Sequence, residues 1–437
     1  MRILDWTALD ETARRLALRR PAMQVNDSIG QRVREIVERV RAEGDAALIS
    51  LAAELDRAQL ESLRVDADEV QAAQAELSAE AKQAIATAID NITRFHAAQQ
   101  VPPICVETVP GVICERISKP LRAVGLYVPA GTAPLPSTAI MLAVPAAIAG
   151  CPVRVMCTPP RPDGRADPAV VTAATACGIR TIYKAGGAQA IAAMAYGTAT
   201  VPKVLKIFGP GNAWVTAAKT LVAADPDGAA LDMPAGPSEV MVIADAEANP
   251  RFVALDLLSQ AEHGPDSHAV LVCTDRTMVA AVQAEIDRTL PGLPRRDTIR
   301  KALGHALAVI VPTLADAVNV ANEYAPEHLI LQTAEPRALA AGVDTAGSVF
   351  IGAWTPESLG DYCSGTNHVL PTYGYARTYS GLSVADFQRR MTLQEASLPG
   401  LRTLAPTVRT LAQLEGLDAH AQAVVTRLEQ ADSGRKP

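Results

Sequence analysis

The stretch SQAEHGPDS places a glutamine and a histidine three residues apart, directly before a Gly-Pro pair. The run ANPRFVALDLLSQAEHG is apolar at helical spacing, and Gly264-Pro265 is a strong stop signal. Gln260 and His263 therefore share one face at the end of a helix. An amide oxygen and an imidazole could bind a metal ion there, although the same spacing also occurs at ordinary helix ends that water reaches.

Few other side chains could complete such a metal site. Asp361 and His368 lie in the polar segment ESLGDYCSGTNHVLPTYGY, and His420 lies in LEGLDAHAQAV near the C-terminus. Glu415 is five residues before His420, on a different helix face, so it would more naturally contact a substrate. No cysteine and histidine cluster indicates a closed structural zinc site. Oxygen and imidazole ligands from distant segments suit a catalytic centre with open positions.

The segment YAPEHLILQT carries a second possible chemistry. Pro326 breaks the chain, and Glu327 and His328 then stand at the start of an expected strand. A carboxylate beside an imidazole gives two groups that can take up protons near neutral pH. Charged residues at the start of a strand are also common without any such role.

Two glycine-containing loops, AGGAQ and FGPGN, are expected at strand-to-helix turns. Glycines there let the backbone approach a ligand, and a helix N-terminus favours a phosphate. Gln189 and Asn212 close these loops with amides that both donate and accept hydrogen bonds. No GxGxxG follows a strand, so the usual dinucleotide fingerprint is absent and nucleotide binding stays one of two interpretations.

The elements that must position these residues follow from the alternation of short β-branched runs with Ala-rich helices from about residue 120. This alternation predicts right-handed βαβ units and parallel sheets in two α/β halves of similar architecture. The expected strands are VRVMCT, IRTIYK and VLKIF in one half, and EVMVIAD, HAVLVCT, AVIVPT, HLILQT and SVFIGAW in the other. Ligands of open parallel sheets bind beyond the carboxyl ends of strands, which points to AGG, GPGN, AGPSE and the segment after SVFIGAW.

Composition limits the function classes. The chain has 437 residues, a net charge of −7, and 49% hydrophobic against 20% charged residues. These values predict two or more globular domains and argue against nucleic acid or an anionic membrane as a partner. The longest apolar stretch, STAIMLAVPAAIAGC, is too short to span a bilayer, and the N-terminus has no signal-peptide core. We therefore expect a cytoplasmic protein.

The seven cysteines show no CxxC pair, and an odd number suits reduced thiols better than a disulfide framework. Most are expected to be small core residues. A thiol could instead trap an aldehyde, as in many aldehyde dehydrogenases. Cys114 and Cys151 are the candidates by position, although neither has a neighbouring base in the sequence.

Together these segments resemble the histidinol dehydrogenase family over nearly the whole chain. The most specific stretches are, in order, VGLYVPAGTAPLPST, GGAQAIAAMAYGT, KIFGPGNAWV, DMPAGPSEV, LLSQAEHGPDS, YAPEHL, GSVFIGAW, ESLGDYCSGTNHVLPT and LEGLDAH. The resemblance implies the last enzyme of histidine biosynthesis, which oxidises L-histidinol to L-histidine in two NAD-dependent steps through an aldehyde held on the enzyme.

The resemblance also assigns roles. The implied zinc ligands are Gln260, His263, Asp361 and His420. The implied acid–base pair is Glu327 and His328. The implied substrate contacts are Ser238, His328, His368 and Glu415 together with the zinc ligands, and the implied contacts to the NAD nucleotide are Tyr127, Gln189 and Asn212. The family is a homodimer whose C-terminal tail crosses over, so His420 is expected to complete the partner subunit's site.

This reading gives a division of labour and a domain plan. Zinc would orient the substrate, His328 would take the hydroxyl proton, and Glu327 would activate water for the second oxidation. The fold class is α/β, with two Rossmann-like parallel-sheet domains and helical segments at both termini. The expected ranges are 1–25 for an N-terminal helical segment, 26–126 with 239–381 for the first domain, 127–238 for an inserted NAD-contacting domain, and 382–437 for a helical tail.

Two positions depart from the family pattern, and three rival functions stay open. Pro129-Ala130-Gly131 stands where the family has Pro-Gly-Gly, and His268 stands where glutamine is common; neither is expected to touch a functional position. The rivals are a related zinc and NAD dehydrogenase of another small alcohol, such as a sulfonated diol, a zinc hydrolase with Glu327 as its base, and a non-catalytic nucleotide-binding regulator.

Overall fold

The computed structural model describes residues 1–20, 27–130, 133–234 and 236–434. The chain divides into two compact units, which are described separately. The first comprises Met1–Gln99 and Leu121–Phe387, and the second comprises Gln100–Pro120 and Gln388–Pro437. None of the described helices is long and apolar enough to cross a membrane.

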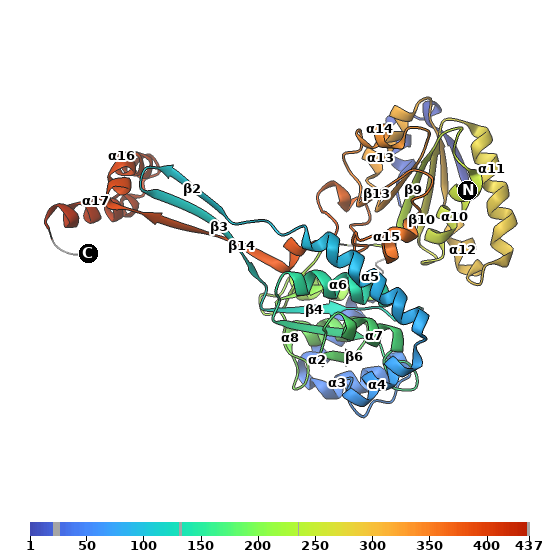
Figure 1. The fold of residues 1–437 in the computed structure, drawn as a ribbon, viewed down its shortest axis with the longest axis horizontal. Helices are drawn as coiled ribbons and strands as arrows, with labels where there is room; N and C mark the ends of the chain where they lie inside the picture. The colour runs from blue at the N-terminus through green and yellow to red at the C-terminus, as the bar shows by residue number, and fades with distance from the viewer. Residues whose placement is uncertain (21–26, 131–132, 235, 435–437) are drawn as a thin grey trace. The chain divides into compact units, whose positions relative to one another are not determined.

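The larger sheet of the first unit has six parallel strands (Figure 1). Their order is β1 (Arg2–Asp5), β11 (Leu307–Ile310), β10 (His268–Cys273), β9 (Glu239–Ala244), β12 (His328–Gln332) and β13 (Ser348–Ile351). Every residue of β9, β10 and β12 is buried, because helices cover both faces, and such strands read as continuous apolar runs.

Helices lie on the two faces of this sheet. One face packs against α10 (Pro250–Ala261), α11 (Arg276–Thr289) and α12 (Arg296–Leu303). The other packs against α13 (Leu314–Tyr324) and α14 (Pro336–Ala340), with Trp6 and Leu18 from the N-terminal segment that holds α1 (Glu11–Ala17). A short helix, α15 (Glu357–Tyr362), follows β13. The short helical turns are Trp6–Ala8, Ala52–Asp56, Leu290–Gly292, Tyr375–Arg377 and Val384–Phe387.

The smaller sheet has five parallel strands. Their order is β6 (Ile182–Lys184), β5 (Val153–Thr158), β4 (Ala123–Tyr127), β7 (Lys206–Phe208) and β8 (Ala230–Leu231). One core cluster joins it to α2 (Asp27–Glu43), α3 (Asp45–Leu51), α8 (Gly187–Tyr196) and α9 (Ala213–Ala223). The opposite face packs against α4 (Ala67–Glu76), α5 (Ala79–Ala97), α6 (Pro136–Ile148) and α7 (Pro168–Ala176).

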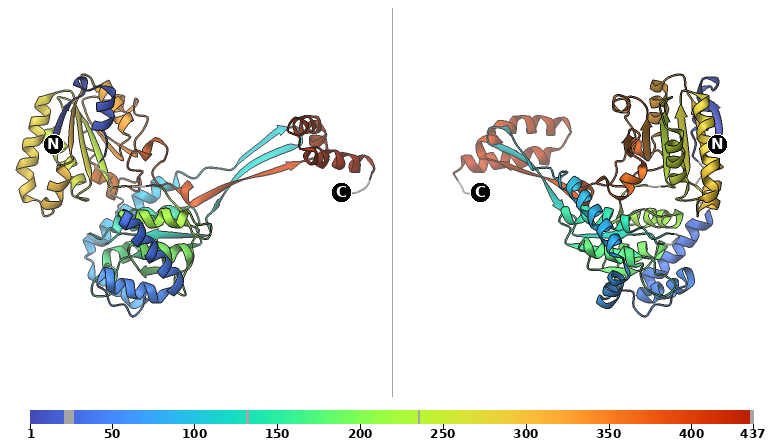
Figure 2. Two further views of the ribbon diagram at one scale, coloured as in Figure 1. Left: turned by 180° about the vertical axis from the view of Figure 1, so that it is seen from behind. Right: turned by 45° about the vertical axis from the view of Figure 1, so that its right-hand side comes forward.

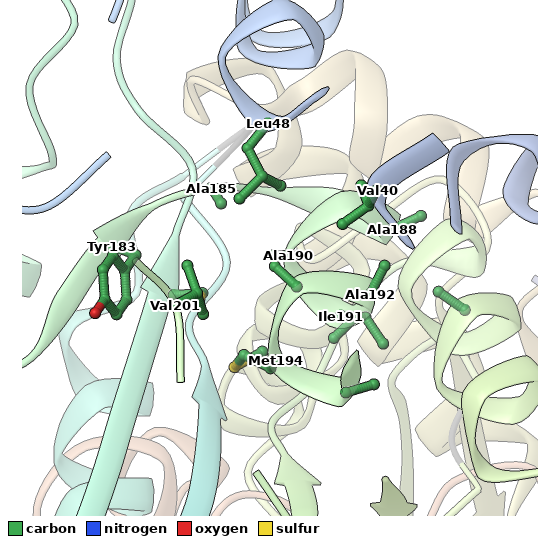
Figure 3. Packing of buried hydrophobic residues seen from close by; sticks show 14 of the residues in the cluster. Val40, Leu48, Tyr183, Ala185, Ala188, Ala190, Ile191, Ala192, Met194 and Val201 are labelled. Carbon is green, nitrogen blue, oxygen red and sulfur yellow. The ribbon is translucent and has the colours of Figure 1, made fainter. Parts of the chain in front are cut away.

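Small side chains bring helix α8 close to its neighbours. Figure 3 shows Ala188, Ala190 and Ala192 of α8 packed with Val40 and Leu48 of the preceding helices. Alanine adds little volume, so the helix backbone can approach the sheet and hold the loop before it in place. The Ala-rich pattern therefore supports the glycine loop at the start of α8.

The second unit is an antiparallel three-stranded ribbon with two helices. Strand β3 (Val112–Pro120) lies between β2 (Ile104–Val109) and β14 (Gln388–Ala396), and the chain then forms α16 (Leu398–Leu414) and α17 (Asp418–Asp432) (Figure 2). The Ser397 amide donates to the Gly111 carbonyl over 2.8 Å. A Cβ at Gly400 would lie 2.5 Å from that same oxygen, so only glycine permits this contact between turn and helix.

The prediction of two Rossmann-like parallel sheets is confirmed. Each predicted strand of both halves is present, with boundaries that differ by up to three residues. The expected loops AGG and GPGN lie directly before α8 and α9. The alternation of apolar runs and Ala-rich helices predicted most strands of both sheets, but it did not give β1, β4 or β8.

The predicted domain ranges are wrong at three places. Residues 1–25 are not only helical, because β1 joins the edge of the larger sheet. The described residues 27–99 pack mainly on the smaller sheet, and Arg64 forms a bridge to Tyr183 beside β6. Their contacts with 239–381 are few and include the bonds of Asn91 to Cys363 and of His96 to Asn367. The tail 382–437 is not only helical, because strand β14 follows the helical turn Val384–Phe387. An amphipathic helix can cover either of two apolar sheet faces, and β14 pairs with β3, which lies far from it in the sequence.

Candidate active site

Three buried ionisable residues of the larger sheet lie at the amino ends of its strands. Glu239, His268 and His328 are the first residues of the neighbouring strands β9, β10 and β12. All three are buried, with exposed fractions of 1 to 3%. Of the loops expected to bind ligands, AGPSE precedes β9, and the segment after SVFIGAW follows β13. The loops AGG and GPGN follow β6 and β7 of the smaller sheet, and ligand binding at any of these places stays a prediction.

His328 presents one ring nitrogen to the site. Its Nδ1 lies 3.1 Å from the Glu239 carbonyl, which can only accept, so Nδ1 carries a proton and donates. In the neutral ring Nε2 then holds the lone pair. This atom has no hydrogen-bond partner among the described residues, and it lies 3.6 Å from Asp361 Oδ1.

Carboxylates surround His328 and change its protonation. Burial lowers the pKa of the ring, but Glu357, Glu327 and Asp361 together raise that pKa well above its usual value. Glu357 Oε1 lies 3.8 Å and Glu327 Oε2 lies 3.6 Å from Nδ1. A protonated His328 would place a positive charge beside these carboxylates.

Glu327 is a buried carboxyl group with one strong hydrogen bond. Its Oε2 accepts from the Glu239 amide over 2.8 Å, and the residue is 5% exposed. Burial raises the pKa of Glu327 to about 8, although the charge of His328 opposes this shift. Such a carboxyl group can exchange a proton near neutral pH, which is what general acid–base chemistry requires.

Three side chains form a group that could hold a metal ion. Ligand atoms of His263, Glu357 and Asp361 all lie within 4.8 Å of one another. Gln260 is fully buried at the end of α10, and neither atom of its amide has a hydrogen-bond partner among the described residues. A buried amide without partners is costly, and a metal ligand role would satisfy it.

Glu357 is the site residue that the sequence reasoning missed. It is 1% exposed, its Oε2 has no partner within the described ranges, and burial raises its pKa to about 8. It stands four residues before Asp361 on α15, so both side chains project from the same helix face. That i,i+4 spacing in ESLGDY was a signal that could have identified it.

The two remaining expected substrate contacts of the first unit lie beside this group. His368 Nδ1 donates to the Asp361 carbonyl over 2.8 Å, and Nε2 lies 3.2 Å from the Thr138 hydroxyl of α6. The partly buried Ser238 directly precedes β9 and accepts the His268 amide through its carbonyl over 3.1 Å. Both expected positions therefore border the acid–base pair.

The three residues expected to contact NAD lie at the carboxyl edge of the smaller sheet. Tyr127 ends β4, and its hydroxyl accepts the Gly187 amide over 3.0 Å. Gln189 on α8 donates to Asp56 over 3.4 Å, and Asn212 caps α9 through the Trp214 and Val215 amides. Gly131 belongs to the segment Pro129-Ala130-Gly131, which differs from the family pattern, and this residue lies outside the described residues.

Glu415 and His420 lie in the second unit. Glu415 is the residue that directly follows α16, His420 belongs to the first turn of α17, and both are exposed. The expected ligand set is thus divided, with Gln260, His263 and Asp361 in the first unit and His420 in the second. The structure of one chain leaves the role of His420 as a prediction.

The hydrogen-bond partners of His96 and His268 account for the burial of both rings without a catalytic role. The His96 ring bonds to the Ile92 carbonyl over 2.9 Å and to the Asn367 amide over 3.3 Å. His268, one of the departures from the family pattern, lies 2.6 Å from the Tyr324 hydroxyl. Burial, with the charge of Arg20, lowers the pKa of His268 to about 4, so this ring is neutral.

The fold and this group of residues define an α/β enzyme with a buried acid–base pair beside a donor set suited to a metal ion. Comparison with known proteins identifies the family. The profile of the histidinol dehydrogenase family matches residues 18–428. The chain therefore belongs to the histidinol dehydrogenase family, whose members are oxidoreductases.

Relatives match over the full length. The chain is 53% identical to the histidinol dehydrogenase of Vibrio parahaemolyticus over 435 residues, with 100% of both chains covered. It is 52% identical to that of Escherichia coli O6:H1 over 426 residues, which cover 98% of this chain and 97% of the relative. The crystal structure of histidinol dehydrogenase from Elizabethkingia anophelis matches with a TM-score of 0.95, 43% identity and 99% coverage of each chain.

The cysteine mechanism has no support in the geometry. Cys151 is buried, its thiol lies 3.5 Å from the Phe387 carbonyl, and burial raises its pKa to about 11, which keeps it protonated. Cys114 lies on β3 in the second unit. We predict that a C114A/C151A variant keeps at least about half of the wild-type turnover, since neither thiol forms a bond in the reaction. Loss of more than about tenfold with an unchanged melting temperature would contradict this.

Proposed function

We propose that the chain catalyses the last step of histidine biosynthesis, the four-electron oxidation of L-histidinol to L-histidine through L-histidinaldehyde, with NAD as oxidant and zinc as metal. The observation that carries this proposal is the arrangement of His328 and Glu327 beside Gln260, His263 and Asp361. The full-length family membership supports the choice of substrate.

The residues of the first unit fit a zinc ion. His263 and Asp361 supply an imidazole and a carboxylate, and Gln260 supplies an amide oxygen that is otherwise buried without a partner. His420 of a second subunit would add the fourth ligand. When bound, zinc would supply positive charge that orients the amino and imidazole nitrogens of the substrate. The same charge would offset the nearby carboxylates, and so lower the pKa of His328 towards the range in which it acts as a base.

His328 would act in the first oxidation. Its Nε2 faces the donor set, while Nδ1–H is held by the Glu239 carbonyl. Nε2 would take the hydroxyl proton of L-histidinol as the hydride leaves carbon for NAD, which gives the aldehyde. Holding Nδ1 fixes the tautomer and the ring plane, so no reorganisation is needed when the proton moves.

Glu327 would act in the second oxidation. Its carboxylate would take a proton from water as that water adds to the aldehyde, and the resulting hydrate would lose a second hydride to NAD and form the carboxylate product. The Glu239 amide holds Oε2 over 2.8 Å, which keeps the carboxylate in one orientation. The two adjacent bases would thus accept protons from different sources, His328 from the substrate hydroxyl and Glu327 from water.

The NAD and substrate contacts complete the proposal. Tyr127, Gln189 and Asn212 would contact the nucleotide, because they stand at the carboxyl edge of the smaller sheet beside glycine loops and the N-termini of α8 and α9. Ser238, His368 and Glu415 would contact the substrate, the last from a partner subunit.

The substrate assignment has a direct test. Purified protein with zinc should form two NADH for each L-histidinol consumed. It should oxidise a sulfonated diol at least about 100-fold less efficiently, because the diol lacks the amino and imidazole nitrogens that the proposed substrate contacts would bind. NADH absorbance with product analysis measures both. Comparable efficiency on the diol would favour the related dehydrogenase, and turnover that ignores NAD would favour a hydrolase.

The division of labour between the two bases predicts an uneven effect of E327Q. This change removes the base for water but leaves His328 and its Glu239 contact. We expect the first oxidation to fall by less than about tenfold, and the oxidation of L-histidinaldehyde to fall by about 10² to 10⁴. Single-turnover NADH formation from the alcohol and from the aldehyde separates the steps. Equal losses would refute the assignment of Glu327 to the second step.

The proposed contribution of His420 to a partner's site predicts complementation between inactive variants. H420A homodimers lack a ligand in both sites, and E327Q homodimers lack the base in both. A mixed dimer would hold one intact site, built from the body of the H420A chain and the tail of the E327Q chain. Exchange of equal amounts should restore about a quarter of wild-type histidine formation by random pairing. No restoration in mixtures shown to contain heterodimers would place His420 in its own chain's site.

A further inference from the structure

One peptide segment holds both members of the acid–base pair. The Glu239 amide donates to Glu327 Oε2 over 2.8 Å, and the Glu239 carbonyl accepts from His328 Nδ1 over 3.1 Å. These contacts are possible because β9 and β12 are neighbours, with His328 opposite Val240. Where the backbone of Glu239 lies therefore decides where both proton-accepting groups point.

The side chain of Glu239 is fixed by an unusually complete set of donors. Arg20 binds it with two nitrogens, Nε to Oε2 at 2.5 Å and Nη2 to Oε1 at 2.9 Å. The Tyr324 hydroxyl lies 3.0 Å from Oε2, and the Tyr373 amide lies 3.1 Å from Oε1. Glu239 is 1% exposed. A bidentate guanidinium contact with further donors fixes the plane of a carboxylate as well as its position.

Arg20 also donates hydrogen bonds to the turn that leads into Glu327. Its Nη2 donates to the carbonyls of Tyr324, at 2.8 Å, and Ala325, at 3.2 Å, at the end of α13. Its guanidinium carbon lies 3.8 Å from the centre of the Tyr324 ring. Ala325 has φ 53°, a left-handed conformation that costs a non-glycine residue about 1 kcal/mol or more. Pro326 and Glu327 follow at once.

Two residues with strained backbone conformations belong to this network of contacts around Glu239 and Arg20. Among the described residues, three that are not glycine have positive φ, and two of them are Ala325 and Tyr373. Tyr373 contacts Glu239 through its amide, and its ring leaves no room for a Cβ at Gly236, which would lie 2.3 Å from Cδ2. Strained residues persist where surrounding contacts hold them, and they concentrate where function requires a defined geometry.

We propose that Arg20 and Glu239 are positioning residues for the reaction: their buried ion pair holds the Glu239 peptide segment and the Ala325 turn in the register that aims Glu327 and His328. The inference rests on the proposed function of that pair. Neither side chain is assigned a contact with substrate, zinc or NAD. A buried ion pair is weak evidence for stability in itself, because desolvation offsets the attraction, whereas small displacements of catalytic groups cost rate steeply.

The test compares R20M with a matched control, R14M, in the zinc-loaded holoenzyme. Arg14 also lies over an aromatic ring, with 5.1 Å to the Trp6 centre, and also donates to a backbone carbonyl, but it does not bind Glu239. We expect R20M to lower kcat for L-histidinol and for L-histidinaldehyde by about 10- to 100-fold, with KM within about threefold and zinc content unchanged. R14M should change kcat by less than about twofold.

A double-mutant cycle separates positioning from a general structural effect. If Arg20 acts through Glu327, then R20M in the E327Q background should lower L-histidinaldehyde oxidation by less than about threefold, because the group it positions is already lost. R20K, which keeps the charge but cannot form the fork, should lie between R20M and wild type. Y324F provides a milder variant should R20M fold poorly, and its loss should also vanish in the E327Q background.

The outcomes distinguish the two levels of inference. Multiplicative losses for R20M and E327Q, or equal losses for R20M and R14M, would overturn the positioning role while the proposed function stood. A raised KM with unchanged kcat would overturn it as well. Failure of the wild-type enzyme to oxidise L-histidinol, or full aldehyde oxidation by E327Q, would overturn the proposed function and the positioning role together.

Discussion

The amino edge of the larger sheet depends on one constraint, which is the cost of keeping carboxyl groups away from water. Glu239, Glu327 and Glu357 are buried there, and Asp361 is partly covered. An unpaired buried charge costs several kcal/mol, so each of these groups must find a cation, a proton or hydrogen-bond donors. Glu239 is paired with Arg20. The carboxyl groups of Glu327, Glu357 and Asp361 all lie near His328, which is positive only while protonated.

Burial and the closeness of these groups to one another explain the direction of their pKa shifts. Burial raises the pKa of both Glu327 and Glu357 to about 8, and the same carboxylates raise the pKa of His328 well above its usual range. A divalent cation held by Gln260, His263 and Asp361, as proposed above, would oppose these shifts, because it supplies positive charge beside the same carboxylates. Unpartnered atoms on Gln260, His328 and Glu357 belong to the same pattern. A fold selected for stability alone would not retain them.

The two sheets contribute opposite edges to the first unit's chemistry. The larger sheet contributes the amino ends of β9, β10 and β12, and the smaller sheet contributes the loops that follow β4, β6 and β7. The segment around His368 connects them, since Asn367 donates to the Met141 carbonyl over 2.7 Å and His368 bonds to Thr138. The proposed nucleotide contacts and the proposed bases therefore belong to different sheets, each with its own core.

The sequence by itself determined most elements of the two parallel sheets and the candidate chemistry. Apolar periodicity predicted these sheets without β1, β4 and β8 and did not predict the antiparallel ribbon, whereas Gly264-Pro265 marked the end of α10 and Pro326 marked the start of β12. Family motifs identified Glu327 and His328, and supplied the zinc and NAD assignments that stay predictions. These signals are local, since a helix stop or a strand start depends on a few neighbouring residues.

Only the tertiary structure decided which edge of each sheet carries the side chains, and which sheet the helices of residues 27–99 cover. It also brought Glu357 beside His328, and Arg20 beside Glu239 across 219 residues. Charge–charge contacts of this kind leave no pattern in a single sequence, because any arginine could meet any glutamate until packing fixes the strand order. Residue types and family motifs gave the candidate chemistry, but the geometry of these residues depended on the packing of β9 between β10 and β12.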